Sequence, residues 1–138
     1  MPFDPVACVA ALKPWDVVYP FDNLVDPRKH KMWVCVSSAN LWFLRINTSR
    51  YRNICVELSS VDHSFLAHDS FLGCGGDLIA LSDAELEYLL GEQRDSARQG
   101  IIGVVHSSVR PSVCAAIRHS PRLSPYQISR IISELGCP

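Results

Sequence analysis

Apolar residues follow two different spacings along the chain, and these spacings divide it into a β-rich part and a helical part. Short runs of β-branched and aromatic residues, bounded by Pro, Gly, Asn and Asp, are typical of strands. Such runs occur at 13–21, 31–38, 41–48, 53–60, 77–82 and 101–107, and 64–74 is a further extended segment with a polar centre. We expect a mostly antiparallel sheet from these segments.

Two segments combine helical spacing with strong capping signals. Ser82 and Glu85 have the three-residue spacing of a capping box, followed by leucines at helical spacing up to residue 90. Ser124 and Pro125 open a last helix that ends at Gly136. Its apolar face consists of Ile128, Ile131, Ile132 and Leu135. Helices are therefore predicted over about 82–90 and 124–136.

Two weaker helices complete the prediction. Asp4 can cap a short N-terminal helix whose first turn contains Pro5. Ser107 or Ser108 can cap a helix over roughly 109–119. The element order predicts an α+β fold, a small bent antiparallel sheet or barrel with helices packed at one end. We expect a single domain over 1–138, with a barrel-like part at about 12–107 and C-terminal helices at about 108–136.

The runs 31–38 and 41–48 are separated only by Ala39-Asn40, which predicts a hairpin with a tight turn. Both runs are too apolar for simple alternation of inside and outside positions. We therefore expect each strand to be buried on one face and partly covered on the other.

Composition excludes several classes of protein. Hydrophobic residues make up 48% of the chain and charged residues 20%, which is ordinary for a soluble globular protein. No secretion signal and no apolar stretch of membrane-spanning length occurs, so we expect a cytoplasmic protein that does not enter a membrane. The common motifs for nucleotide hydrolysis, dinucleotide binding, zinc proteolysis and serine hydrolysis are missing, and we expect no cofactor and no metal.

The six cysteines show no C-x-x-C pair and no zinc spacing. Cys8, Cys35, Cys55 and Cys114 lie among apolar neighbours, as buried thiols do. The pattern favours reduced thiols. Cys74, which precedes Gly75-Gly76, is the cysteine that we expect to be most exposed, but no base accompanies it.

Positive charge is concentrated in residues 28–52, although the net charge of the chain is only −1. This stretch has six of the 13 Lys and Arg residues and no Asp or Glu. The hairpin would bring loops 28–31 and 49–52 to the same end, where basic side chains could bind phosphates. A solvated basic edge without a ligand is the competing explanation.

Two further residue sets are weaker candidates. His63 and His68, flanked by Asp62 and Asp69, could perform acid–base chemistry or bind a metal, but two histidines are more often structural. The three tryptophans are expected in the core or at an interface, and one could stack on a nucleobase. They are Trp15, Trp33 and Trp42.

Several short motifs occur in an order that is found in a known family. "LKPWDVVYPF" is similar to an opening strand ΦxxGDΦΦ, where Φ is apolar and Trp15 takes the place of the glycine. "KHKMWVCVSS" stands where the family has a strand of the type R-P-x-x-V-x-S, and "LRINTS" ends in a Thr-Ser pair. "HSFLAHDSFLGC", "DLIAL" and "IIGVVHSSVRPSVCAAI" match later segments. Over about 12–119 the chain resembles the MazF/PemK-type toxins, without their Arg-Pro pair and with the final helix as an addition.

The resemblance implies an SH3-like barrel that forms a homodimer and is held inactive by an antitoxin protein. It also implies a metal-independent endoribonuclease that cuts single-stranded RNA through its ribose 2′-OH, leaving a cyclic phosphate and a 5′-OH end. The family's arginine aligns with Lys29, His30 or Lys31, and its hydroxyl residues align with Thr48 and Ser49, so these five are the catalytic candidates. The candidate RNA-binding residues are Arg28, Arg45, Arg50 and Arg52.

Two other functions fit the same pattern. A barrel that has lost cleavage could bind RNA or another protein through the same basic groove. A structural or accessory protein could carry the basic hairpin as a solvated edge.

Overall fold

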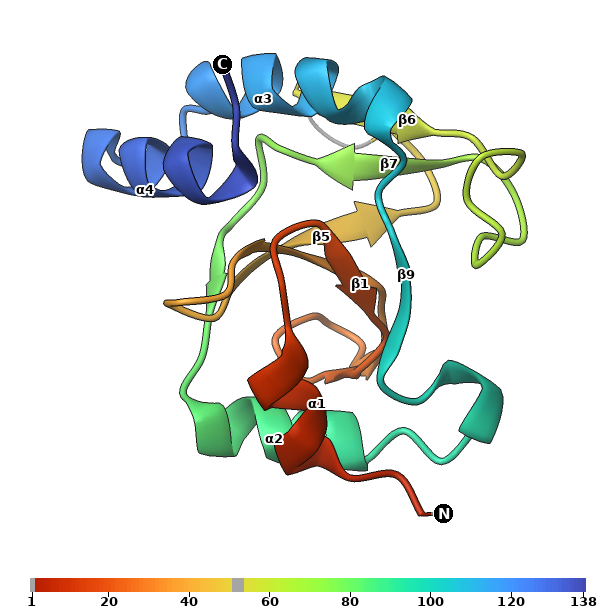
Figure 1. The fold of residues 1–138 in the computed structure, drawn as a ribbon. Helices are drawn as coiled ribbons and strands as arrows, with labels where there is room; N and C mark the ends of the chain where they lie inside the picture. The colour runs from red at the N-terminus through yellow and green to blue at the C-terminus, as the bar shows by residue number, and fades with distance from the viewer. Residues whose placement is uncertain (1, 51–53) are drawn as a thin grey trace.

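A computed structural model describes residues 2–50 and 54–138 and contains a strongly curled antiparallel sheet (Figure 1). The strands follow the spatial order β6-β7-β5-β4-β1-β9, and β8 pairs with β5. Their bounds are β1 (Asp16–Val18), β4 (Trp33–Ser37), β5 (Trp42–Asn47), β6 (Cys55–Leu58), β7 (Ser70–Gly73), β8 (Ile79–Ala80) and β9 (Ile101–Val104). The predicted α+β fold with a bent, barrel-like antiparallel sheet is confirmed.

The helices form two pairs on opposite sides of the β4–β5 strands and are not all packed at one end, so this part of the prediction is wrong (Figure 1). Helices α1 (Pro5–Ala11) and α2 (Asp83–Gly91) contact each other on one side. Helices α3 (Arg110–Arg118) and α4 (Pro125–Leu135) pack together on the other. Short 3-10 helices, η1 (Ser96–Arg98) and η2 (Ser107–Val109), precede β9 and α3.

The capping predictions hold for three of the four helices. Asp4 accepts hydrogen bonds at the start of α1, and complete capping boxes begin α2 at Ser82 and α4 at Ser124. Neither Ser107 nor Ser108 caps α3, because both belong to η2. The side chain of His106 caps η2 instead.

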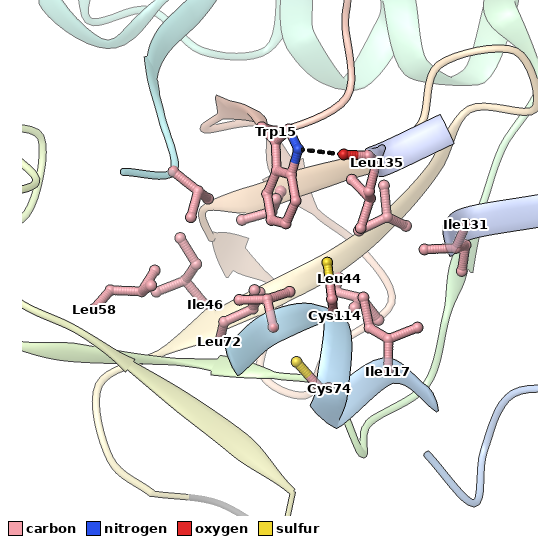
Figure 2. Packing of buried hydrophobic residues seen from close by; sticks show 14 of the residues in the cluster. Trp15, Leu44, Ile46, Leu58, Leu72, Cys74, Cys114, Ile117, Ile131 and Leu135 are labelled. Carbon is pink, nitrogen blue, oxygen red and sulfur yellow. Dashed lines mark hydrogen bonds between the residues drawn. The ribbon is translucent and has the colours of Figure 1, made fainter. Parts of the chain in front are cut away.

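The β4–β5 hairpin separates two apolar cores, which explains its continuous hydrophobicity. Alternate side chains of a strand point to opposite faces of the sheet. Val34, Val36, Leu44 and Ile46 pack with α3 and α4, whereas Trp33, Cys35, Leu41 and Phe43 pack with α1 and α2. Figure 2 shows Leu44 and Ile46 in the first core with Ile117 and Leu135.

Trp15 lies inside the predicted strand 13–21 and directly precedes β1. Its φ of 80° lies in the left-handed region, which favours glycine. The buried ring joins the first core, and its Nε1 donates a hydrogen bond to the carbonyl oxygen of Leu135 at 3.0 Å (Figure 2). Burial and this hydrogen bond offset the strained backbone. Trp33 is also buried and Trp42 packs on Tyr126, so all three tryptophans have structural contacts.

A second, small hairpin was not predicted. The run 13–21 contains β1 and the first residue of β2 (Phe21–Asp22), which pairs with β3 (Lys29–His30). Residues 23–28 between β2 and β3 form a loop. This hairpin places two of the catalytic candidates, Lys29 and His30, on a strand.

The loop between β6 and β7 reaches the opposite edge of the sheet at β9. Phe65 packs directly over Gly103, where a Cβ atom would overlap its ring. His63 is buried, accepts a hydrogen bond from the backbone N–H of His106 at 3.0 Å and contacts the Ser59 carbonyl oxygen at 2.8 Å. His63 is therefore a structural residue that attaches the loop to the end of β9.

The cysteines differ from the expectation in two ways. Cys114 on α3 and Cys137 after α4 form a disulfide, with their Cα atoms 5.9 Å apart, so the six thiols are not all reduced. Cys74 is buried, not exposed, and burial raises the pKa of its thiol to about 12. A thiol in this state is a poor nucleophile. Within 2–50 and 54–138, none of the helices has the length and apolar character needed to cross a membrane.

Candidate functional site

A pocket of about 490 Å³ brings the two ends of the predicted basic hairpin together. The segment 29–32 contributes to one part of its wall and 46–49 to another. The remaining described lining residues are Tyr19, Phe65, Leu66, Ala67, His68, Ser70 and Arg98. Three of the described lining residues, Lys29, Lys31 and Arg98, are cationic and none is acidic. A pocket with this charge favours an anionic ligand.

A buried ion pair fixes the β2–β3 hairpin that carries Lys29 and His30. The carboxylate of Asp22, which is fully buried, accepts hydrogen bonds from Arg45 Nε at 2.6 Å and from Trp33 Nε1 at 3.0 Å. Burial tends to raise the pKa of Asp22, but the hydrogen bonds from Arg45 and Trp33 outweigh it and lower the pKa below its usual value. This carboxylate lies outside 28–52, which is why the basic stretch seemed to have no balancing acid.

Arg45 is therefore positioned as a structural residue. Its guanidinium forms two hydrogen bonds with Asp22, and its side chain is only 17% exposed. Arg45 also lines a second hollow beside Lys29 and Lys31, so its contact with RNA phosphates stays a prediction.

Lys31 lies at the centre of the basic cluster. Antiparallel pairing of Trp33 with Arg45 places the residues just before β4 beside the end of β5. The Lys31 ammonium donates to Asn47 Oδ1 at 2.6 Å. Burial lowers the pKa of Lys31, and the positive charges of Lys29 and Arg45 lower it further. An anion that binds here would relieve this repulsion.

His30 is held in one tautomer by Gln93. The amide oxygen of Gln93 accepts from the Asp95 backbone N–H at 3.1 Å, so its nitrogen is the donor. This nitrogen lies 2.9 Å from the Tyr19 carbonyl oxygen and 3.2 Å from His30 Nδ1. Nδ1 must accept, and the proton of the neutral ring is therefore on Nε2. His30 can donate a hydrogen bond to a ligand in the pocket.

The other predicted residues divide into two groups. Thr48 and Ser49 are exposed and line the pocket beside the cations. Arg28 is exposed but is not one of the described lining residues. Arg50 lies over the Phe71 ring at 4.9 Å and is likewise outside the described pocket wall. Arg52 falls outside the described residues.

Three residues of the site were not predicted there. Arg98 and His68 line the pocket, and Gln93 contacts His30. Arg98 lies 4.9 Å from the centre of the Tyr19 ring and also pairs with Asp95 at 3.6 Å. It reaches the pocket because β9 pairs with β1, with Ile101 opposite Val18. In the sequence, Arg98 is seen only as one arginine of the polar segment 93–100. Nothing in this segment indicates that it folds beside Tyr19 and the basic hairpin.

A second hollow of about 380 Å³ adjoins the first and shares Lys29, Lys31 and Asn47 with it. Its wall also contains Asp26 and Asp77, which could accept hydrogen bonds from amino groups. The two hollows therefore share a basic wall. Among residues 2–50 and 54–138, no group of three or more His, Cys, Asp or Glu side chains is arranged to hold a metal ion.

A scan against protein-family models finds no match, and no curated protein matches the chain. The pocket and the short motifs therefore carry the functional inference.

Proposed function

We propose that this protein is a toxin-like endoribonuclease that cleaves single-stranded RNA without a metal ion. The supporting observation is the pocket whose described wall contains the cations Lys29, Lys31 and Arg98 and the hydroxyl residues Thr48 and Ser49, with no described acidic residue. Such a site binds a phosphodiester and can stabilise the additional negative charge of a pentacovalent phosphorane.

In the proposed reaction the ribose 2′-oxygen attacks the adjacent phosphorus, and the 5′-oxygen leaves. The products are a 2′,3′-cyclic phosphate and a 5′-OH end. The ammonium groups of Lys29 and Lys31 stabilise the nonbridging oxygens, and Thr48 and Ser49 position them through hydrogen bonds. His30 donates from Nε2 to the same phosphoryl group. Lysine contacts phosphate as a point charge and not as a fork, so this site orients the phosphate less strictly than one with arginine.

Two structural features support the resemblance to MazF/PemK-type toxins. Trp15 stands at the glycine position of the opening motif, and its φ is positive, a conformation that glycine adopts readily. Thr48 and Ser49, which match the family's hydroxyl pair, lie in the same pocket as Lys29–Lys31. We extend the proposal to a homodimer, to an antitoxin partner and to action in the cytoplasm, where such a partner would restrain cleavage.

The test is cleavage of a mixed single-stranded RNA by the purified protein in EDTA, with the ends of the products identified. We expect cyclic phosphate and 5′-OH ends. The double variant Lys29→Gln, Lys31→Gln should lose cleavage and show a shallower dependence of RNA binding on salt, because two phosphate contacts disappear. Lys13→Gln removes one exposed cation outside the described pocket wall and is the control.

Three results distinguish the candidate functions. Cleavage with these ends supports the endoribonuclease. Salt-dependent RNA binding without cleavage by the wild-type protein supports the binding module that has lost activity. If the wild-type protein neither binds nor cleaves RNA, the proposal is refuted. This result would favour a basic edge that is merely solvated.

A further inference from the structure

His68 adds a second imidazole to the wall of the pocket that contains Lys29, His30 and Lys31. It is exposed and lies on the β6–β7 loop, just before β7 begins at Ser70. The loop is held on both sides of this residue. Asp69 Oδ1 accepts from the backbone N–H and the hydroxyl of Ser60 at 2.8 and 3.1 Å. His68 is therefore presented by an attached loop.

The hydrogen bond of His68 determines which nitrogen is basic. Nδ1 lies 3.0 Å from the Asp69 carbonyl oxygen. A carbonyl oxygen can only accept, so Nδ1 carries the proton and Nε2 of the neutral ring has a lone pair. A histidine whose Nδ1–H is bonded in this way is oriented to take a second proton at Nε2.

Among the described contacts of His30, His63 and His106, none combines a bonded Nδ1–H with an Nε2 that lacks a protein donor. In His30, Nδ1 accepts from Gln93, and Nε2 carries the proton. In His63, Nε2 accepts from the His106 backbone N–H, and Nδ1 contacts the Ser59 carbonyl oxygen. His106 uses Nδ1 to accept from the backbone N–H of Ser108. Of the two histidines among the described lining residues, His68 alone has its lone pair on Nε2 with no described protein donor.

We propose that His68 is the general base of the reaction, an inference that rests on the endoribonuclease proposed above. Its Nε2 takes the proton of the ribose 2′-OH while the bond from the 2′-oxygen to phosphorus forms. The bond from phosphorus to the 5′-oxygen breaks, and its electron pair stays on the 5′-oxygen, which takes a proton from the Lys31 ammonium. The His68 imidazolium then returns a proton to water, and Lys31 regains one from water. No electrons are exchanged with a further reagent.

The surroundings suit both roles. When His68 gains a proton, its Nδ1–H still donates to the Asp69 carbonyl oxygen, and a hydrogen bond from a charged donor is stronger than one from a neutral donor. Lys31 sits among positive charges and is partly buried, so it releases a proton more readily than a solvated lysine does. Asn47 holds its ammonium in the pocket wall.

The experiment compares His68→Gln with the control His119→Gln, which alters an exposed histidine that is not among the described lining residues. Cleavage is measured at saturating RNA, and affinity is measured with an RNA that carries 2′-deoxyribose at the cleavage site. We expect His68→Gln to slow cleavage about 10²–10⁴-fold, the usual contribution of a general base, with unchanged affinity. His119→Gln should cleave at the wild-type rate.

An RNA with a 5′-bridging sulfur separates the base from the acid, because a thiolate leaves without protonation. This substrate should restore part of the cleavage by Lys31→Gln, which still lacks one contact to the nonbridging oxygens, but should not restore cleavage by His68→Gln. Wild-type-like cleavage by His68→Gln, or rescue of this variant by the sulfur substrate, would overturn the assignment and leave the endoribonuclease intact. Absence of cleavage by the wild-type protein would overturn both.

Discussion

Replacing Asp22 with alanine is the sharpest test of how the hairpin that carries Lys29 and His30 is held. The substitution removes four hydrogen bonds, donated by Arg45 Nε, Arg45 Nη2, Trp33 Nε1 and the Leu24 backbone N–H. Removing one partner of a buried ion pair costs about 3–5 kcal/mol, because the other charge stays buried. Since Arg45 is 17% exposed and can gain some hydration, we expect the lower end, about 3 kcal/mol.

The assay is urea unfolding at neutral pH, supported by thermal unfolding. A loss of about 3 kcal/mol corresponds to a fall in Tm of roughly 10 °C for a chain of this size. The double variant Asp22→Leu, Arg45→Met should recover most of this loss, because it replaces the pair with apolar side chains. Asp77→Ala is the control: its pair with Arg122 is exposed, and we expect a change below about 0.5 kcal/mol.

The stability that Asp22 contributes should decrease in acid. The pKa of Asp22 is lowered by folding, so its stabilisation is complete above the ordinary aspartate pKa and is lost as the pH falls through the lower folded value. The difference in stability between the wild-type protein and Asp22→Ala should therefore shrink in acid. A loss below about 1 kcal/mol at neutral pH, or a difference that grows in acid, would refute the assignment of this pair as a structural anchor.

Four further predictions can be checked with the same assays. Gly103→Ala displaces the Phe65 ring and should cost about 1–3 kcal/mol and slow cleavage; unchanged stability would show that the loop is not held there. Trp15→Gly relieves the positive φ but removes a buried ring, and urea unfolding should show a net loss of about 3 kcal/mol rather than a gain. Ser82→Ala breaks the capping box of α2 and should cost about 1 kcal/mol, whereas no change would contradict that geometry. The pKa of Lys31 is lowered, so RNA affinity should begin to weaken at a lower alkaline pH than it would with an ordinary lysine. Arginine stays charged at these pH values, so the Lys31→Arg variant should not show this weakening. The same pH dependence in the variant and the wild-type protein would contradict the prediction.

The sequence alone was sufficient to predict those elements whose structure is determined by residues close together along the chain. Capping boxes at Ser82 and Ser124 satisfy free backbone N–H groups at the start of their helices, so four residues of sequence suffice to place each helix start. The β4–β5 hairpin follows from two apolar runs and a short turn. Hairpin pairing also explains why Lys29–Lys31 and Thr48-Ser49 could be predicted to meet: antiparallel strands bring the residues before one strand beside those after the next.

Hydrophobic pattern could not show how many layers cover the sheet. The apolar run Trp33–Val36 in β4 indicates only that both faces of the strand are buried. The structure shows that α1 and α2 cover one face and that α3 and α4 cover the other (Figure 1). The same ambiguity hid the disulfide, because the apolar neighbours of Cys114 indicate burial but not proximity to Cys137.

The composition of the pocket depended on contacts between distant segments. Arg98 enters through the pairing of β9 with β1, and His68 enters because its loop is attached to the end of β9. Gln93 selects the tautomer of His30 across 63 residues of sequence. Charge and hydrogen-bonding capacity are properties of each side chain and can be seen in the sequence. Whether a charge is used inside the protein, as in Arg45, or is available to a ligand, as in Lys31, depends on a partner that chain folding brings to it.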